Sequence, residues 1–300
     1  RGDAITVRKE LSPHGCGYIA DFPFEFAKFG LKPNEARCMD PQQALAMLAA
    51  DLDVADSGIG AAALAGPRTG VYLGAWNQDF QGERSSAYDV VGSNPSLITA
   101  RVSSHWDLRG PSVLVNTACA SSLECVVRAL GDLRLGRVDV ALVGGVNVIQ
   151  DPEFTERMKR GGFLGDSCRC KTFDATADGY VRSEGAVVAV LVRSDAPALE
   201  GAGPDRYYAE VLGAASNHNG RSPLITVPSA EAQAELITAA CRDAGIAPGD
   251  LDAVECHGTG TRIGDPIEVS GIAQALQSGA GESPEKPLYL TSAKSNVGHL

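Results

Sequence analysis

Continuous apolar runs alternate with amphipathic stretches along most of the chain, and this alternation predicts its secondary structure. Runs rich in Val, Leu and Ile predict strands at residues 70–76, 112–116, 138–149, 186–192, 207–215, 251–255 and 288–292. An amphipathic period predicts helices at residues 42–54, 120–135 and 230–244. Nearly continuous apolar strands separated by helices are typical of sheets that are covered on both faces. We therefore expect a layered α/β fold.

The connector at residues 196–204 is rich in Pro and Gly and is the best candidate for a boundary between two halves of the chain. It separates an N-terminal half, residues 1–195, from a C-terminal half, residues 205–300. Each half places a strand before a loop that bears a reactive side chain. The long stretch 151–185 has no sustained period, and we expect it to be irregular.

Composition and charge exclude several classes of protein. With 300 residues and 44% hydrophobic content, the chain can bury a large core. Its 26 basic and 37 acidic residues give a formal charge of −11, which disfavours binding to nucleic acid or to anionic lipid. The longest apolar runs, such as residues 185–192, are shorter than the roughly 20 residues of a membrane span. We expect a soluble protein that does not bind membranes.

Eight cysteines in a chain of this length, without an apolar leader, do not resemble a secreted disulfide framework. They favour the cytoplasm or another reducing compartment. Cys168 and Cys170 lack a second Cys or His pair at zinc-like spacing, so we expect no metal site. Four other cysteines are interpreted as small buried hydrophobic residues: Cys16, Cys38, Cys125 and Cys241.

Nucleotide-binding motifs are absent or incomplete. Gly58 and Gly60 mimic part of a dinucleotide fingerprint, but residues 51–57 are not a buried strand and no βαβ unit surrounds them. The chain also lacks the G-x-x-x-x-G-K-[ST] loop that cradles phosphates. We expect no nucleotide cofactor.

Cys119 lies in the segment TACASS, between the strand predicted at 112–116 and the helix predicted at 120–135. A thiolate on such a turn faces the first amides of a helix and its positive end, which lowers the thiol pKa. The alternative is a small core residue beside a tight turn. Residue type and position leave both open.

Two histidines stand in similar positions later in the chain. His257 follows the strand predicted at 251–255 and opens the segment HGTGT, whose glycines let the backbone turn and whose threonines offer hydroxyls. His299 stands five residues after Lys294. A buried Lys294 would disfavour the imidazolium form of His299 and hold that ring neutral as a hydrogen-bond donor. Each histidine can equally be structural, as we expect of His14, His105 and His218.

Asp265 and Glu268 lie three residues apart around Pro266. They are either a pair of catalytic carboxylates or the acidic first turn of a helix. A cysteine before a helix and two later histidines after strands are the components of thioester chemistry that needs neither a metal nor an organic cofactor.

Together these segments resemble the active-site signatures of β-ketoacyl synthases, specifically the ketosynthase domain of type I modular polyketide synthases. Further stretches resemble the family at residues 39–43, 107–112, 144–147, 169–174, 178–182 and 264–268. The resemblance covers essentially the whole chain from about residue 20 onward. It implies a thiolase-like fold of two duplicated halves in α-β-α-β-α layers, usually a homodimer.

The resemblance also implies roles. Cys119 matches the nucleophile that accepts the acyl chain, and His257 and His299 match the two histidines that promote decarboxylative condensation with a malonyl-type extender. Lys294 matches the lysine that orients the second histidine. The remaining matches are Asp265 and Glu268, which support the site, and Thr259 and Thr261, which contact the pantetheine arm. The substrates are carried on the phosphopantetheine of acyl carrier protein, and no metal or other cofactor is implied.

Several positions depart from the family pattern without removing a reacting group: Ala44, Ala120 and Cys256. The chain begins at Arg1 and ends at Leu300, and the family's first core strand and glycine-rich C-terminal loop are expected outside these ends. We therefore expect a chain truncated at both ends that condenses poorly by itself.

Three alternatives to a polyketide ketosynthase remain. One is the fatty acid version of the same reaction, which shares the motif residues. Another is a non-elongating ketosynthase that transfers acyl chains or serves as a scaffold, although such proteins usually lack the first histidine and His257 is present. A thiolase is disfavoured, because it acts on coenzyme A esters and ordinarily needs a second catalytic cysteine. Other polyketide synthase domains are expected partners if the chain is part of a larger protein.

Overall fold

The computed structural model describes residues 5–7, 17–19, 22–82, 87–196, 207–222, 224–279 and 286–300. These residues form two compact units. The first unit holds the described residues of 1–11, 18–151 and 184–208, and the second those of 12–17, 152–183 and 209–300.

The units differ from the halves predicted from the sequence, because residues 152–183 pack with the C-terminal part of the chain. Within this stretch the Thr172 hydroxyl donates to the Gly258 carbonyl oxygen at 2.5 Å, and the Phe173 amide donates to the Asp265 carboxylate at 2.8 Å. The connector predicted at 196–204 lies almost entirely outside the described residues.

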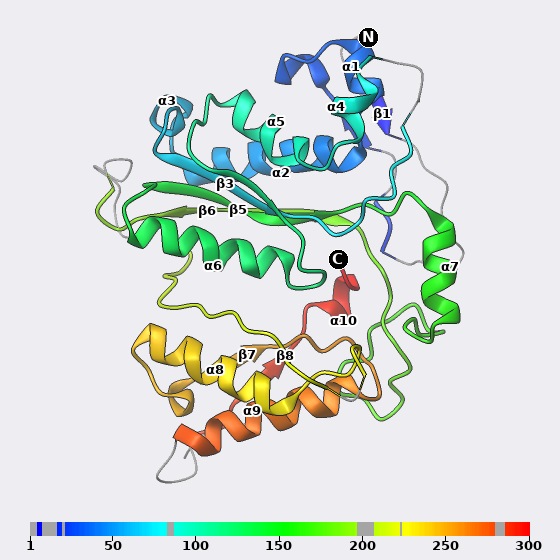
Figure 1. Cartoon of the computed structure of the whole chain (residues 1–300), viewed down its shortest axis with the longest axis vertical. Helices are drawn as coiled ribbons and strands as arrows, with labels where there is room; N and C mark the ends of the chain where they lie inside the picture. The colour runs from blue at the N-terminus through cyan, green and yellow to red at the C-terminus, as the bar shows by residue number, and fades with distance from the viewer. Residues whose placement is uncertain are drawn as a thin grey trace. The chain divides into compact units, whose positions relative to one another are not determined.

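A four-stranded sheet organises the first unit (Figure 1). Its strand order is β4-β3-β5-β6, with β3 parallel to β4 and β5, and β6 antiparallel to β5. The strands are β3 (Thr69–Gly74), β4 (Ser112–Val115), β5 (Val140–Asn147) and β6 (Gly185–Val192). Helices α2 (Pro41–Ser57) and α5 (Leu97–His105) cover one face, and α6 (Ser121–Arg134) covers the other. Every residue of β3 is buried, as expected of a strand between two helical layers.

Smaller elements complete the first unit. A two-stranded antiparallel sheet pairs β1 (Ile5–Val7) with β2 (Phe22–Phe24). The short helices are η1 (Phe26–Phe29), α1 (Pro33–Arg37), α3 (Ala61–Leu64) and α4 (Asp89–Ser93).

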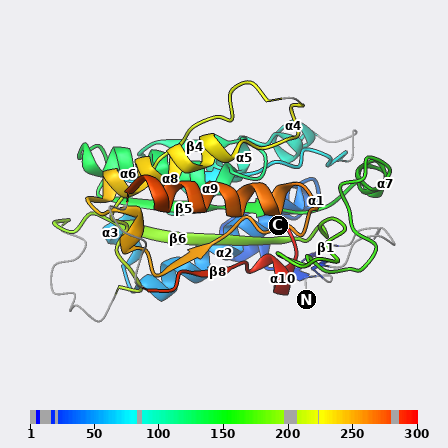
Figure 2. The same cartoon turned by 90° about the horizontal axis from the view of Figure 1, so that it is seen from below.

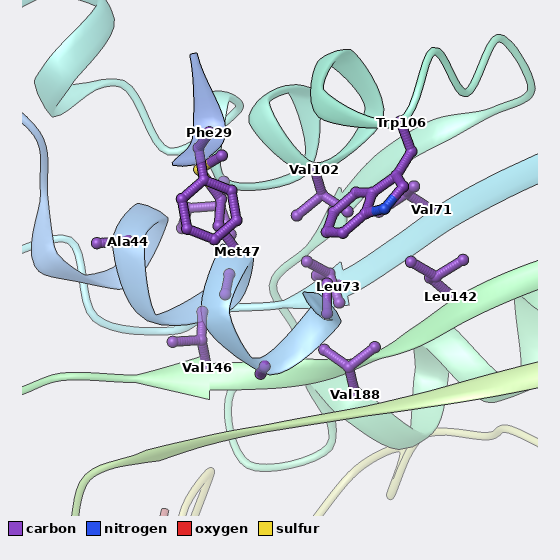
Figure 3. Close-up of a cluster of buried hydrophobic side chains, with 14 of the residues drawn as sticks. Phe29, Ala44, Met47, Val71, Leu73, Val102, Trp106, Leu142, Val146 and Val188 are labelled. Carbon is purple, nitrogen blue, oxygen red and sulfur yellow. The ribbon is translucent and has the colours of Figure 1, made fainter. Parts of the chain in front are cut away.

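The hydrophobic core of this unit fills the space between the sheet and α2 and α5. Met47 of α2, Val102 of α5, Leu73 of β3 and Val188 of β6 belong to one buried cluster (Figure 3). Helix α2 begins at Pro41 after Asp40, whose carboxylate accepts the Gln42 amide at 2.8 Å.

The incomplete dinucleotide motif has a structural explanation. Gly58 ends α2 with a φ of 65°, a left-handed conformation that glycine adopts without strain. The residues before Gly58 form helix α2 rather than a strand, so this segment lacks the strand that precedes the glycines of a dinucleotide-binding motif.

The second unit contains a short parallel sheet and a pair of helices. Strand β7 (Ala253–Glu255) pairs with β8 (Tyr289–Thr291), and α8 (Ala230–Ala244) lies beside α9 (Gly264–Gly279) (Figure 2). The other elements are α7 (Pro152–Arg160), η4 (Pro248–Asp250) and α10 (Lys294–Val297). Within the described residues, no helix combines the length and apolarity needed to cross a membrane.

Two predictions of secondary structure were wrong. The described residues 207–215 do not form the expected strand, and most of their side chains are exposed. Residues 151–185 are not wholly irregular, because α7 opens that stretch. Its nine residues carry charges and a single buried side chain, Thr155, so they lack the apolar stripe that the prediction relied on.

The structure describes three of the four cysteines that were predicted to be buried, and it confirms the prediction for each of the three. Cys38, Cys125 and Cys241 are buried, and Cys16 lies outside the described residues. Cys168 is disulfide-bonded. The reducing compartment therefore stays a prediction.

Candidate active site

Cys119 lies in a tight turn between β4 and α6, as predicted. The residue before it, Ala118, has a φ of 53°, a left-handed conformation that is uncommon for a residue with a Cβ atom. Ser121 holds this turn, because its hydroxyl donates to the Ala118 carbonyl oxygen at 2.6 Å and accepts the Thr117 amide at 2.9 Å. The side chain of Cys119 is exposed at the start of α6.

Glycine in the neighbouring strand lets the start of α6 approach the sheet closely. A Cβ atom on Gly74 would lie 2.7 Å from the Ser121 carbonyl carbon and 2.8 Å from the Ser122 nitrogen. Both atoms belong to the backbone at the start of α6. This backbone cannot move aside without shifting the turn that carries Cys119. Gly74 therefore fixes the height of this turn above the sheet.

We expect Gly74→Ala to destabilise the protein by about 1–3 kcal/mol, as overpacking in a dense core does. The matched control is Gly131→Ala in α6, where an added Cβ atom meets nothing within 4 Å. That change is expected to be neutral or to stabilise the helix by up to about 1 kcal/mol. Denaturant unfolding of both variants checks this, and equal stability of the two would contradict the role given to Gly74.

In the second unit, the loop that bears His257 is held by two carboxylates from the first turns of α9. Glu268 accepts the His257 amide at 2.6 Å and the Gly258 amide at 2.8 Å. Asp265 accepts the amides of Gly260 at 3.1 Å and Thr261 at 3.2 Å. The two acids therefore lie at the start of α9, as one of the two interpretations predicted, and they also hold the histidine loop through its backbone amides.

The threonines of this loop lie close together. The hydroxyl oxygens of Thr259 and Thr261 are 3.4 Å apart, and Thr259 is buried. Gly258 permits a close approach, since a Cβ atom there would lie 2.6 Å from the Thr172 methyl carbon. The loop is thus a compact turn fixed on both sides.

His299 follows α10 and is held by backbone hydrogen bonds to the segment 180–183. Its amide donates to the Val181 carbonyl oxygen, and its carbonyl oxygen accepts the Ser183 amide, both at 2.8 Å. Between α10 and His299, Gly298 has a φ of 79°. The histidine therefore occupies a fixed backbone register within the second unit.

The two imidazole rings meet. The ring centroids of His257 and His299 are 5.5 Å apart, and the rings are nearly perpendicular, at 87°. Desolvation of the ring by the surrounding protein, followed by the charge of Lys294, lowers the pKa of His257 to about 4, although the residue as a whole is exposed. Burial, followed by His257 and with a smaller effect of Lys294, lowers the pKa of His299 to about 4. Both rings are therefore neutral at physiological pH.

The His299 ring also lies close to the last residue of the chain, because its Nδ1 is 2.7 Å from an oxygen of Leu300.

Two protein-family models match the chain. The model described as the N-terminal domain of β-ketoacyl synthase matches residues 6–196, and the model described as its C-terminal domain matches residues 208–300. The chain belongs to the β-ketoacyl synthase family.

Relatives of this β-ketoacyl synthase include long synthases. A fatty acid synthase of Anser anser anser is 37% identical over 297 residues, which cover 96% of this chain and 81% of that sequence. Highly reducing polyketide synthase 40 of Fusarium pseudograminearum is 41% identical over 284 residues, which cover 92% of this chain and 11% of that sequence.

Solved structures of ketosynthase domains share the fold. An oxazolomycin ketosynthase domain from Streptomyces albus JA3453 matches with a TM-score of 0.82 and 35% identity, over 90% of this chain and 48% of that one. The ketosynthase from module 6 of the bacillaene synthase of Bacillus subtilis 168 matches with a TM-score of 0.80 and 34% identity, over 90% and 46%. The thiolase-like α/β fold is therefore confirmed. This chain spans about half the length of these solved structures.

The departures of this β-ketoacyl synthase from the family pattern are accommodated locally. Cys256 is buried directly before His257, and burial raises the pKa of its thiol to about 11. Ala44 is buried in α2, and Ala120 precedes the first residue of α6. None of the three displaces a residue of the predicted site.

Most of the predicted site residues come together in the second unit: His257, His299, Lys294, Asp265, Glu268, Thr259 and Thr261. Cys119 belongs to the first unit. Two histidines expected to be structural have ordinary local contacts. His105 packs its ring on Trp106 with centroids 4.3 Å apart, and His218 accepts the Gly220 amide at 2.9 Å. His14 lies outside the described residues.

Sequence reasoning missed the residues of 172–183 that surround the histidines. Thr172 and Phe173 bind the histidine loop through Gly258 and Asp265. Tyr180 lies against His299, with ring centroids 5.1 Å apart. The available signals were the family-like stretches at 169–174 and 178–182, which identified the segment without indicating its role.

Proposed function

We propose that this chain is the ketosynthase of a polyketide synthase and catalyses decarboxylative Claisen condensation. An acyl group on Cys119 would be joined to a malonyl-type extender on acyl carrier protein. The observation that carries this proposal is the contact between two neutral imidazoles, His257 and His299, in a β-ketoacyl synthase. Uncharged N–H donors stabilise a developing enolate without holding the extender's carboxylate in place by a full charge.

In the first step, the Cys119 thiolate attacks the carbonyl carbon of an acyl thioester on the carrier's phosphopantetheine. The carrier thiolate leaves and takes up the proton that Cys119 has given up, so the exchange needs no further reactant. The exposed turn at the positive end of α6 supports this role, because such a position favours the thiolate.

In the second step, the bond between the extender's α-carbon and its carboxylate breaks and carbon dioxide leaves. The electron pair forms an enolate, whose oxygen accepts a hydrogen bond from His257. His299 adds a second donor when its proton lies on Nε2. The enolate carbon then attacks the acyl carbonyl and expels the Cys119 thiolate, which takes a proton from solvent, and a β-ketoacyl thioester remains on the carrier.

This mechanism requires that Cys119 of the first unit and the histidines of the second unit reach the same substrate. It uses no metal, nucleotide or flavin, because the thiolate and the imidazoles supply the nucleophile and the donors. Thr259 and Thr261 are proposed to contact the pantetheine arm, whose amides suit a pair of neighbouring hydroxyls.

The proposed partners follow from the substrate and from the relatives. Acyl carrier protein delivers both thioesters. A homodimer and further synthase domains are also proposed, since most relatives are many times longer than this chain. The reaction places the protein in the cytoplasm or another reducing compartment, where its thiol stays reduced.

A condensation assay tests the proposal. A longer form of the protein, which continues beyond Arg1 and Leu300, is used because this chain is expected to condense poorly by itself. It is loaded with a radiolabelled acyl group and then given malonyl-carrier protein, and β-ketoacyl product and carbon dioxide are expected in equal amounts. Loading without either product would favour a non-elongating transacylase or scaffold. The 37% identity to the Anser anser anser fatty acid synthase keeps a fatty acid ketosynthase open as an alternative. Such an enzyme would accept saturated acyl groups and reject acyl groups that retain a β-oxygen.

Glu268→Ala is expected to reduce decarboxylation about 10- to 100-fold, because a small misplacement of a reacting group has an effect of this order. The variant loses both acceptors that hold the backbone of His257 and Gly258. Acyl loading of Cys119 should be unchanged, and Glu210→Ala, at an exposed position, is the matched control. Equal decarboxylation by the two variants would contradict the positioning role of Glu268.

A further inference from the structure

Tyr180 is fixed by the backbone on both of its sides. Its amide donates to the Phe163 carbonyl oxygen at 3.1 Å, and its carbonyl oxygen accepts the Gly165 amide at 3.0 Å. Gly179 directly before it has a φ of 134°, and a Cβ atom there would lie 2.5 Å from the Gly165 nitrogen. The amide of Gly179 also donates to the Gly260 carbonyl oxygen, in the loop of His257, at 3.0 Å.

This anchoring places the Tyr180 ring against His299. The two ring centroids are 5.1 Å apart at an angle of 52°, and the nearly perpendicular ring of His257 is another neighbour of the same imidazole. The tyrosine hydroxyl points elsewhere, because it donates to the Met158 sulfur at 3.8 Å. The contact with His299 is therefore made by the ring.

A buried cation belongs to the same segment. Arg182 is 3% exposed, its guanidinium donates to the Thr155 hydroxyl at 2.7 Å, and it lies 5.0 Å from the Phe154 ring centroid. Arg182 also forms a backbone bridge with His299. The charged or titratable groups that act on His299 are thus His257, Lys294 and Arg182.

We propose that Tyr180 is a positioning residue for His299, because the Tyr180 ring covers one side of the His299 imidazole. Arg182 assists Tyr180 by placing a buried positive charge near His299. The segment keeps His299 both oriented and uncharged. Burial is the largest cause of the lowered pKa of His299, and Arg182 acts in the same direction. The consequence for catalysis rests on the proposed function, whereas the effect on the ring does not.

The test is a titration of the histidine rings by NMR in the whole chain, with carbon-13-labelled histidine. The chain has five histidines, and His299→Gln identifies the signal of His299. In Tyr180→Leu, the midpoint of His299 is expected to rise from about 4 toward the ordinary value of 6.5, since water reaches the ring. Tyr180→Phe keeps the ring and should leave the midpoint unchanged.

A second pair of variants keeps the proposal falsifiable if Tyr180→Leu does not fold. Arg182→Met should raise the midpoint of His299, and Arg182→Lys should not, because it keeps the charge. The midpoint of His257 should stay in place in both, since Arg182 does not contribute to its shift. The proposal would be overturned by an unchanged titration midpoint of His299 in Tyr180→Leu or in Arg182→Met. It would also be overturned by an equal rise of that midpoint in Tyr180→Phe and Tyr180→Leu.

Catalysis gives a separate readout. Tyr180→Leu is expected to slow decarboxylation roughly 10- to 100-fold while acyl loading of Cys119 is unchanged. If the wild-type protein condenses nothing, the proposed function fails, and the NMR titration still decides the role of Tyr180.

Discussion

Cys119→Ala is expected to abolish acyl loading, with a loss on the order of a thousand-fold or more, as removal of a covalent nucleophile does. The thiol lies on an exposed turn whose strained residue, Ala118, and supporting hydroxyl, Ser121, present it at the start of α6. Incubation with a radiolabelled acyl-carrier protein, followed by gel separation, measures the label that stays on the protein.

Cys125→Ala is the matched control, because it removes a thiol from α6, the helix that directly follows Cys119. Cys125 is fully buried, and burial raises the pKa of its thiol to about 12, so it supplies no thiolate. This variant should load like the wild type. Label that persists in Cys119→Ala, or that disappears in Cys125→Ala while the fold is retained, would remove Cys119 as the acyl acceptor.

The fold of the first unit could be predicted well, because the apolar pattern of its strands and main helices reflects their packing around the same four-stranded sheet. The apolar runs at β3, β5 and β6 and the amphipathic period of α6 are local signals that the structure confirms. The division into compact units could not be predicted, since residues 152–183 join the second unit through Thr172 and Phe173. Such hydrogen bonds join residues about ninety positions apart and leave no periodic signal.

The candidate site was predictable in its residue types and less so in its supports. Asp265 and Glu268 were expected either to open a helix or to form a catalytic pair. The structure places them at the start of α9, where they accept backbone amides of the histidine loop. Tyr180 gave no signal of its own role, since a ring contact depends on tertiary packing.

His257→Ala is expected to leave acyl loading intact and to reduce decarboxylation and condensation about 100- to 1,000-fold, the usual loss when one oxyanion donor is removed. His257→Gln retains an amide donor and should lose less. His218→Ala, at an exposed histidine of the same unit, is the matched control. If His257→Ala releases carbon dioxide from malonyl-carrier protein as fast as His218→Ala, the donor role is wrong.

The pH dependence of decarboxylation gives a second measurement of His257. Its folded pKa, about 4, lies below the ordinary value of 6.5, so the ring stays neutral as the pH falls through 6.5. The rate should therefore hold until the pH approaches about 4, and then fall as the imidazolium forms and pairs with the extender's carboxylate. Lys294→Met removes a charge that lowers this pKa, so the acid limb should move upward, toward 6.5. A wild-type acid limb already near 6.5, unmoved in Lys294→Met, would show that neither burial nor Lys294 keeps this ring uncharged.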